Sequence, residues 1–170
     1  MEQGDIFPTG NDRRLLFSLE EFRSIFLTAL RQNVDQNRHD NLGDHNLNPG
    51  MFPPEFTKSA AVLVPVIGRE QEPTILLTKR SDDLNHHAGQ VSFPGGRHEE
   101  SDLNMIDTAL RETEEEIGLD RDAVEVIGEL PTYETRTGFS VKPIVGLIKP
   151  PIELNIDSKE VADVFEIPIL

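Results

Sequence analysis

Three glutamates, Glu112, Glu115 and Glu116, lie close together in residues 111–118. If this segment is a helix, spacings of three and four residues make their carboxylates neighbours, and such like-charged pairs destabilise a helix by roughly 0.2–0.5 kcal/mol each. A bound cation would offset this repulsion, and a set of oxygen ligands selects magnesium or manganese. The pattern therefore predicts a Mg²⁺ or Mn²⁺ site, with a solvated acidic face as the simpler alternative.

Two glycines, Gly95 and Gly96, follow Phe93 and Pro94 shortly before the acidic segment. Glycine lets the backbone come close to a ligand or a metal ion and turn into a helix. We therefore expect Gly95 and Gly96 to take part in substrate binding.

Basic side chains precede the glycines. Lys79 and Arg80 end an apolar stretch with the pattern of a strand, where they could meet substrate phosphates or simply be surface charges. Of the two, Arg80 is the better candidate. His86 and His87 stand in a polar segment without cysteine or an HExxH helix, so we expect them to be solvated or hydrogen-bonded rather than zinc ligands.

Two helices are predicted around these groups. Residues 18–32 carry apolar side chains at helical spacing, and Ser18 with Glu21 forms a capping-box pattern. Residues 105–117 form the second helix, which ends at Gly118 and turns one face towards a sheet, namely Ile106, Ala109, Leu110, Thr113 and Ile117.

Apolar runs predict the strands. Residues 60–67 and 74–78 read as two neighbouring buried strands, with Pro65 at a bulge or sheet edge. Further strands are expected at 124–130, 139–148 and 164–170, whereas 33–57 reads as a long mobile connection. Strands flanked by helices indicate an α/β domain over residues 59–170, preceded by a helix and a connecting segment in 1–58.

The composition excludes several classes of partner. The chain has 31 acidic and 16 basic residues, so its net charge of -15 would repel nucleic acid. A phosphorylated small molecule is compatible, because divalent cations between carboxylates and phosphate reverse the local charge. There is no cysteine. No apolar segment has the length of a signal peptide or of a membrane span of roughly 18 residues, so we expect a cytoplasmic protein without a membrane partner.

Residues 95–119, GGRHEESDLNMIDTALRETEEEIGL, resemble the Nudix box of hydrolases that act on nucleoside diphosphates linked to another moiety. The usual box has glycine, five residues, glutamate, seven residues and then R-E-U-x-E-E-x-G-U, where U is aliphatic. Here Thr113 replaces one aliphatic residue, Asp102 replaces the first glutamate, and eight residues separate Asp102 from Arg111. The resemblance implies a Nudix-type α/β/α sandwich with a mixed sheet, plus an N-terminal helix.

A second resemblance concerns the residues before the box. The sequence LLTKRS at 76–81, followed by Gly89 and by FPGG at 93–96, is similar to the signature of coenzyme A diphosphatases, which also tend to lengthen the box by one residue. Asn85 stands where that signature has arginine, the residue whose planar fork suits phosphate. Such relatives usually continue into helical sequence after the strand near Leu170, so a longer protein is an expectation.

The resemblance also implies a role for single residues. Glu112, Glu115 and Glu116 are expected metal ligands, with the Gly96 carbonyl as a further one. Arg111 is expected to orient a glutamate through a salt bridge, and at i+4 it can reach Glu115. A metal-activated water would attack phosphorus, and the general base is either Glu112 or Glu160.

Three functions stay open. The first is hydrolysis of coenzyme A or acyl-coenzyme A to adenosine 3',5'-bisphosphate and 4'-phosphopantetheine. The second is the same chemistry on ADP-ribose, NADH, a dinucleoside polyphosphate or a nucleotide sugar. The third is a binding module without turnover, which the three retained glutamates disfavour. A homodimer through the apolar N-terminal helix is also an expectation, because proteins of this fold often pair.

Overall fold

The computed structural model describes residues 17–35, 42–48, 50–52, 57–82 and 88–169. Its helices are α1 (Leu19–Asp35), α2 (Asp44–Leu47) and α3 (Met105–Ile117), with a 3-10 turn at Arg121–Ala123. Its strands are β1 (Leu42–Gly43), β2 (Lys58–Ile67), β3 (Thr74–Arg80), β4 (Val91–Ser92), β5 (Gly95–Arg97), β6 (Val124–Glu129), β7 (Tyr133–Glu134), β8 (Phe139–Ile148) and β9 (Val161–Pro168).

The described strands form one mixed sheet around β2 and β8. These two strands run parallel from Lys58↔Phe139 to Ile67↔Ile148. On its other side, β2 pairs antiparallel with β5 near its start and with β3 near its end. The expected bulge or sheet edge at Pro65 is wrong, because Pro65 pairs with Gly146 in the central strand pair without a shift of register. Proline is tolerated there because, on the other side of β2, Pro65 falls between the pairings with β5 and β3.

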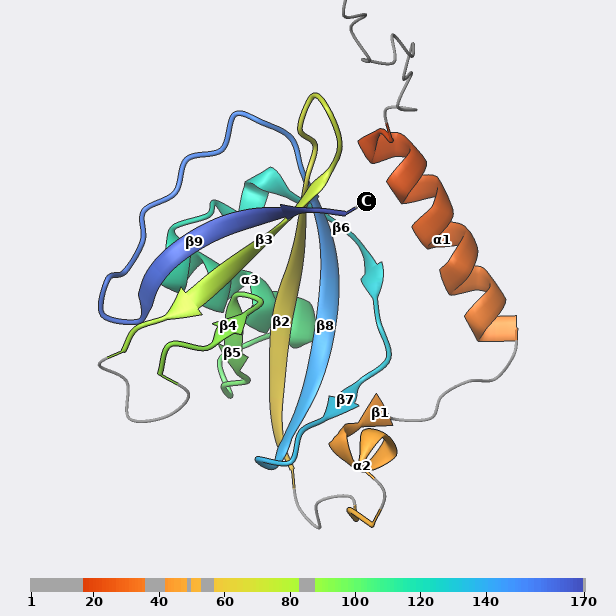
Figure 1. Cartoon of the computed structure of the whole chain (residues 1–170), viewed down its shortest axis with the longest axis vertical. Helices are drawn as coiled ribbons and strands as arrows, with labels where there is room; N and C mark the ends of the chain where they lie inside the picture. Colours follow the sequence, from red (N-terminus) through yellow and green to blue (C-terminus); the bar gives the residue numbers. More distant parts are fainter. Residues whose placement is uncertain (1–16, 36–41, 49, 53–56, 83–87, 170) are drawn as a thin grey trace, which may run out of the picture.

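Each face of the sheet carries one helix. In Figure 1, α3 lies behind the sheet and α1 runs alongside β6. Ala109 and Ile117 of α3 pack on Leu63 and Ile144 in the larger core cluster. The sheet therefore lies between two helical layers, which confirms the expected α/β class.

Helix α1 begins as the capping box predicts. The Ser18 backbone N–H donates to the Glu21 carboxylate at 2.7 Å, and the Glu21 N–H donates to the Ser18 hydroxyl at 3.2 Å. The apolar face packs on its own sheet through Phe22 and Phe26, while Ile25 is 60% exposed. Within the described residues, no helix is both long and apolar enough to cross a bilayer.

Helix α3 coincides with the predicted 105–117. The Asn104 side chain accepts from the Asp107 N–H at its start, and Gly118 ends it in the left-handed conformation, with φ 68°. The predicted sheet face is incomplete, because Thr108 and Glu116 are also buried. The acidic segment is therefore not simply a solvated face.

The segment 33–57, predicted to be a long connection, contains short elements that were not predicted, and α1 extends into it as far as Asp35. Leu42–Gly43 pairs in parallel with Tyr133–Glu134, and a short helix follows at Asp44–Leu47. Two-residue strands show no periodicity in a sequence, which also explains why β4 and β7 were not predicted. Strand β9 begins at Val161, earlier than expected. Asn85, His86 and His87 lie outside the described residues.

Candidate active site

The central acid of the site is Glu116, which α3 turns inwards. Its side chain is 5% exposed, and its carboxylate accepts the Gly95 backbone N–H at 3.1 Å. Arg80 at the end of β3 approaches the other carboxylate oxygen at 3.7 Å. Burial raises the pKa of Glu116 to about 7, with further increases from Glu112 and Glu160. Helix α3 thus holds a carboxyl group that burial makes costly to ionise, even with Arg80 beside it.

Glu112 lies one helical turn before Glu116 and faces Gly96. A Cβ atom on Gly96 would lie 2.4–2.8 Å from the carboxylate atoms of Glu112, so glycine leaves room for the carboxylate in its present position. Burial is the first cause that raises the pKa of Glu112. The adjacent glycines therefore approach two different acids, Gly95 through its N–H and Gly96 through the space it leaves.

Arg111 connects the acids on the outer side of the helix. Its guanidinium contacts Glu112 at 3.1 Å and Glu115 at 3.0 Å, the latter being the i+4 pair that the sequence predicts. It also donates to the Arg97 carbonyl at 3.1 Å. Glu115 is 59% exposed, so it points further from the core than Glu112 and Glu116 do.

Asp102 stands where the usual box has its first glutamate, and it was not among the predicted site residues. It is buried and receives a two-pronged contact from Arg111, Nε to Oδ1 at 2.7 Å and Nη2 to Oδ2 at 3.0 Å. This contact with Arg111 holds the pKa of Asp102 well below its usual range. The altered spacing between Asp102 and Arg111 thus still brings the two residues together.

Glu160 comes from the turn before β9, far from the helix in sequence. Its backbone carbonyl accepts the Ser81 N–H at 2.8 Å, which ties this turn to the end of β3 beside Arg80. Its charge contributes to raising the pKa of both Glu112 and Glu116. The structure therefore brings Glu160 near the helix acids.

The two basic candidates, Lys79 and Arg80, lie on opposite faces of the sheet. Ile75 packs in the cluster on the α1 side of the sheet, and Lys79, four residues further along β3, leaves the same face. Arg80 points to the α3 side, where it meets Glu116. The Nε atom of Arg80 is buried without a hydrogen-bond partner. Arg80 thus has an unused donor near the acids, whereas Lys79 faces away from them.

The donors at this site fit a divalent cation. Glu112, Glu115, Glu116 and the Gly96 carbonyl offer only oxygen, and the space that Gly96 leaves is filled by a carboxylate. Burial is the first cause of the raised pKa of Glu116, and the nearby acids Glu112 and Glu160 raise it further, although Arg80 lowers it. Among the described residues, no three acidic or histidine side chains are already grouped as a metal site.

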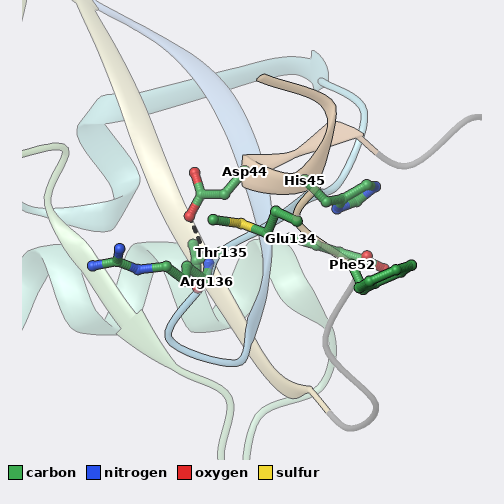
Figure 2. A pocket seen from close by; sticks show the side chains of 7 residues that line it. Asp44, His45, Phe52, Glu134, Thr135 and Arg136 are labelled. Atoms are coloured by element: carbon green, nitrogen blue, oxygen red, sulfur yellow. Dashed lines mark hydrogen bonds between the residues drawn. The ribbon is translucent and has the colours of Figure 1, made fainter. Parts of the chain in front are cut away.

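A hollow near the end of β3, outside the acidic site, was not predicted. It has a volume of about 390 Å³, and Asp44, Gln90 and Arg136 are among the residues that line it. Gln90 faces Arg80 across the strand pair, because its carbonyl accepts the Arg80 N–H at 2.9 Å. Figure 2 shows the neighbouring pocket of about 60 Å³, where a dashed line joins Asp44 to the turn at Arg136. That bond is the Arg136 N–H donated to Asp44 at 2.6 Å.

Comparison with known proteins gives relatives in sequence and in fold. The chain is 49% identical over 121 residues to a Yersinia enterocolitica protein named Uncharacterized Nudix hydrolase NudL, across 71% of this chain and 61% of that protein. It spans about 60% of the length of such curated relatives. Two solved structures, each 20% identical, share the fold: a C. elegans Ap4A hydrolase binary complex and the NUDIX domain of Shewanella oneidensis NrtR with ADP ribose.

For the first structure the TM-score is 0.54, with 63% of this chain and 77% of that chain covered. For the second the TM-score is 0.51, with 72% and 78% covered. The family model described as NUDIX domain matches residues 57–165, which include β2, β5, α3 and the turn at Glu160. Since the match contains every element that carries the acidic site, this chain belongs to the Nudix family.

Proposed function

We propose that this chain is a divalent-cation-dependent hydrolase that cleaves the diphosphate bond of a nucleoside diphosphate derivative, with coenzyme A or acyl-coenzyme A as the first candidate substrate. The observation that carries the proposal is the contact of two carboxylates with the paired glycines of β5. Glu116 accepts the Gly95 N–H, and the Glu112 carboxylate lies against Gly96. Acids that are held apart from water and close to each other are typical of sites where a metal ion meets phosphate oxygens.

In this reaction a water oxygen bonds to one phosphorus while the bridging P–O bond breaks. A divalent cation on Glu112, Glu115, Glu116 and the Gly96 carbonyl would lower the pKa of water and offset charge on the diphosphate. Arg80, whose side chain is 29% exposed beside Glu116, donates to a phosphate oxygen. Arg111 keeps Glu112 and Glu115 in place through its contacts at 3.1 and 3.0 Å.

The proton of the attacking water goes to a carboxylate, for which Glu112 and Glu160 are the two candidates. Glu160 is exposed and lies on the turn tied to Ser81, so it can accept a proton and release it to solvent. Glu112 has a raised pKa but is also an expected metal ligand. We favour Glu160 as the general base, because a carboxylate cannot serve fully as ligand and base at once.

The hollow beside Gln90, whose carbonyl accepts the Arg80 backbone N–H, provides room for the substrate beyond its diphosphate. Its volume of about 390 Å³ lies within the range of small-molecule sites, roughly 300–1,000 Å³. Arg136 has an exposed guanidinium, and among the described residues it forms no ion pair within 4 Å. A phosphate or hydroxyl at the far end of the substrate would therefore find an exposed cationic fork there, beside Asp44.

A second candidate is the same reaction on ADP-ribose, NADH, a dinucleoside polyphosphate or a nucleotide sugar. Asn85 favours it, because asparagine cannot hold phosphate as the arginine of the coenzyme A signature does. The solved structures with Ap4A hydrolase activity in their name or ADP ribose bound share only the fold with this chain. They suggest which compounds to assay.

One assay separates the candidates. The chain is incubated with coenzyme A, acetyl-coenzyme A, ADP-ribose, NADH and diadenosine polyphosphates, with Mg²⁺ or Mn²⁺, and products are identified by mass spectrometry. We expect adenosine 3',5'-bisphosphate and 4'-phosphopantetheine from coenzyme A, and no product from the Glu116→Gln variant. Cleavage of another compound alone would transfer the proposal to that substrate. Binding of these compounds without cleavage of any would instead indicate a module without turnover.

A further inference from the structure

A chain of buried polar groups continues from Asp102 to the outside of the protein. The hydroxyl of Thr108, which is 0% exposed, lies 2.9 Å from the Asp102 carboxylate and 2.8 Å from His98 Nδ1. His98 keeps 29% of its side chain exposed. Neither Thr108 nor His98 has a role in the proposed reaction, yet both adjoin the residue that holds Arg111.

Counting protons determines the direction of these hydrogen bonds. A threonine hydroxyl has a single proton to donate. Asp102 stays ionised because Arg111 holds its pKa far below the usual range, so this carboxylate can only accept. The other acceptor near this hydroxyl is the Asn104 carbonyl at 3.2 Å, which is more distant and uncharged, so the proton goes to Asp102 at 2.9 Å. Both groups can only accept from Thr108, which leaves His98 Nδ1 as the donor to the Thr108 oxygen. His98 Nδ1–H thus donates to the Thr108 oxygen, and the Thr108 hydroxyl donates to the Asp102 carboxylate. This carboxylate also accepts hydrogen bonds from Arg111.

We propose that Thr108 and His98 are positioning residues, which hold Asp102 and thereby fix the Arg111 guanidinium where it contacts Glu112 and Glu115. The Asp102 oxygen that accepts from Thr108 also accepts from Arg111 Nη2 at 3.0 Å and from the Glu99 N–H at 2.9 Å. The same Arg111 nitrogen lies 3.1 Å from Glu112. A displacement of Asp102 is therefore passed directly to the acid beside Gly96.

The helix itself offers a matched control. Thr113 is 1% exposed on the same helix, and its hydroxyl donates only to the Ala109 carbonyl of its own helix, at 2.7 Å. Valine at Thr113 or at Thr108 removes one buried hydroxyl while keeping the branched shape of threonine. Only Thr108→Val breaks the connection to Asp102. A comparison of the two variants thus separates positioning of Arg111 from the general cost of losing a buried hydroxyl.

The test follows Arg111 directly, without a need for turnover. In ¹⁵N-labelled protein the Arg111 Nε–H resonance is assigned by its disappearance in Arg111→Lys. We expect this resonance to shift and broaden in Thr108→Val, and to stay unchanged in Thr113→Val and in Thr108→Ser, which keeps the hydroxyl. Mn²⁺ affinity, measured by titration calorimetry, should fall about 10- to 100-fold in Thr108→Val, the usual effect of losing a group that orients a ligand.

His98 supplies the second variant, in case Thr108→Val does not fold. His98→Ala removes the donor at the exposed end of the chain, whereas His98→Asn keeps an N–H close to the position of Nδ1. We expect His98→Ala to weaken Mn²⁺ binding and His98→Asn to restore most of it. The idea is overturned if Thr108→Val and His98→Ala leave the Arg111 resonance and Mn²⁺ affinity as they are in Thr113→Val.

The kinetic part of this inference rests on the proposed function. With a substrate from the assay above, Thr108→Val should lower kcat about 10-fold or more and leave KM nearly unchanged, because Arg111 orients ligands rather than substrate. A protein that cleaves no compound but shows the expected resonance and Mn²⁺ changes would refute the proposed function alone. Equal kcat in the two valine variants would refute the positioning role alone.

Discussion

The Glu116 carboxylate and the Gly95 backbone N–H form a hydrogen bond of 3.1 Å across 21 residues of sequence. This bond joins α3, which carries the acids, to β5, which pairs with the centre of the sheet. Burial raises the pKa of this carboxylate, so its ionised form is unfavourable in the folded protein. The side chain that links the helix to the sheet is therefore also one that a bound cation would stabilise in its ionised form.

Replacing Glu116 by glutamine should stabilise the metal-free protein at alkaline pH. The folded pKa of about 7 lies above the ordinary value of 4.5, so the contribution of Glu116 to stability is complete below pH 4.5 and is lost as the pH rises through 7. At pH 8 we expect Glu116→Gln to exceed the wild type by at most about 3 kcal/mol, at roughly 1.4 kcal/mol per pH unit. Urea unfolding at pH 4, 6 and 8 with EDTA measures the difference, which a Mg²⁺-saturated sample should reverse. A constant difference at all three pH values would contradict the prediction.

The two glycines of β5 should respond differently to alanine. At Gly95, with φ 144°, a Cβ would lie 2.4 Å from the Ala61 carbonyl, so Gly95→Ala should cost about 2–4 kcal/mol of folding free energy. At Gly96 a Cβ would meet only the movable end of Glu112, so Gly96→Ala should keep nearly the wild-type Tm. Its Mn²⁺ affinity and kcat should nevertheless fall about 10- to 100-fold. Equal loss of Tm in both variants would show that Gly96 is structural.

Only one of the adjacent basic residues should matter for catalysis. Arg80→Ala removes a donor beside Glu116, and losing a charge-assisted hydrogen bond of about 1.5–3 kcal/mol would lower kcat/KM at least about 10-fold. Lys79→Ala should change kcat/KM little, because Lys79 leaves the face of the sheet opposite to α3. Steady-state kinetics on the substrate found by the assay compares the two. A larger effect at Lys79 would mean that the substrate binds on the face of the sheet opposite to α3.

Asparagine at Asp102 should destabilise the protein by an amount that does not vary near neutral pH. Asp102 has a lowered pKa, so its stabilising contribution is present above its ordinary value of 3.8 and disappears only as the pH falls towards the folded value. We expect Asp102→Asn to cost about 2 kcal/mol from pH 5 to pH 8, because Arg111 loses a charged acceptor. Chemical unfolding across this range tests it, and the gap from wild type should narrow below pH 4. A gap that grows on acidification would have the wrong sign.

Arg136→Ala should weaken substrate binding more than catalysis. The guanidinium borders the hollow beside Gln90 and lies outside the acidic site, so KM should rise about 10-fold for coenzyme A, the effect of one lost charged contact, while kcat stays near the wild-type value. Arg31 on α1 is also exposed and serves as the control, since Arg31→Ala removes the same charge elsewhere. Dephospho-coenzyme A, which lacks the ribose 3'-phosphate, shows whether that phosphate is what Arg136 binds. Equal KM values in the two alanine variants would exclude the hollow as a subsite.

Local sequence was sufficient for elements whose signals repeat. Helix α3 was predicted to the residue, because Gly118 ends the apolar pattern in a conformation that glycine adopts readily. Strand β8 was likewise predicted with its observed bounds, since apolar and β-branched residues recur along FSVKPIVGLI. Strands β1 and β7 are two residues long, and they are defined by strand pairing, β1 with β7 and β7 also with β8.

The sequence by itself determined the acid cluster, its spacing on one helix and the glycine pair before it, because i+3 and i+4 neighbours follow from the helical repeat alone. Only the tertiary structure decided that Glu116 is buried while Glu115 is exposed, that Arg80 faces the acids while Lys79 does not, and that Glu160 adjoins them. Those relations depend on how a helix is rotated against a sheet and on which strands pair. Both are set by contacts between residues far apart in the chain, which no local pattern records.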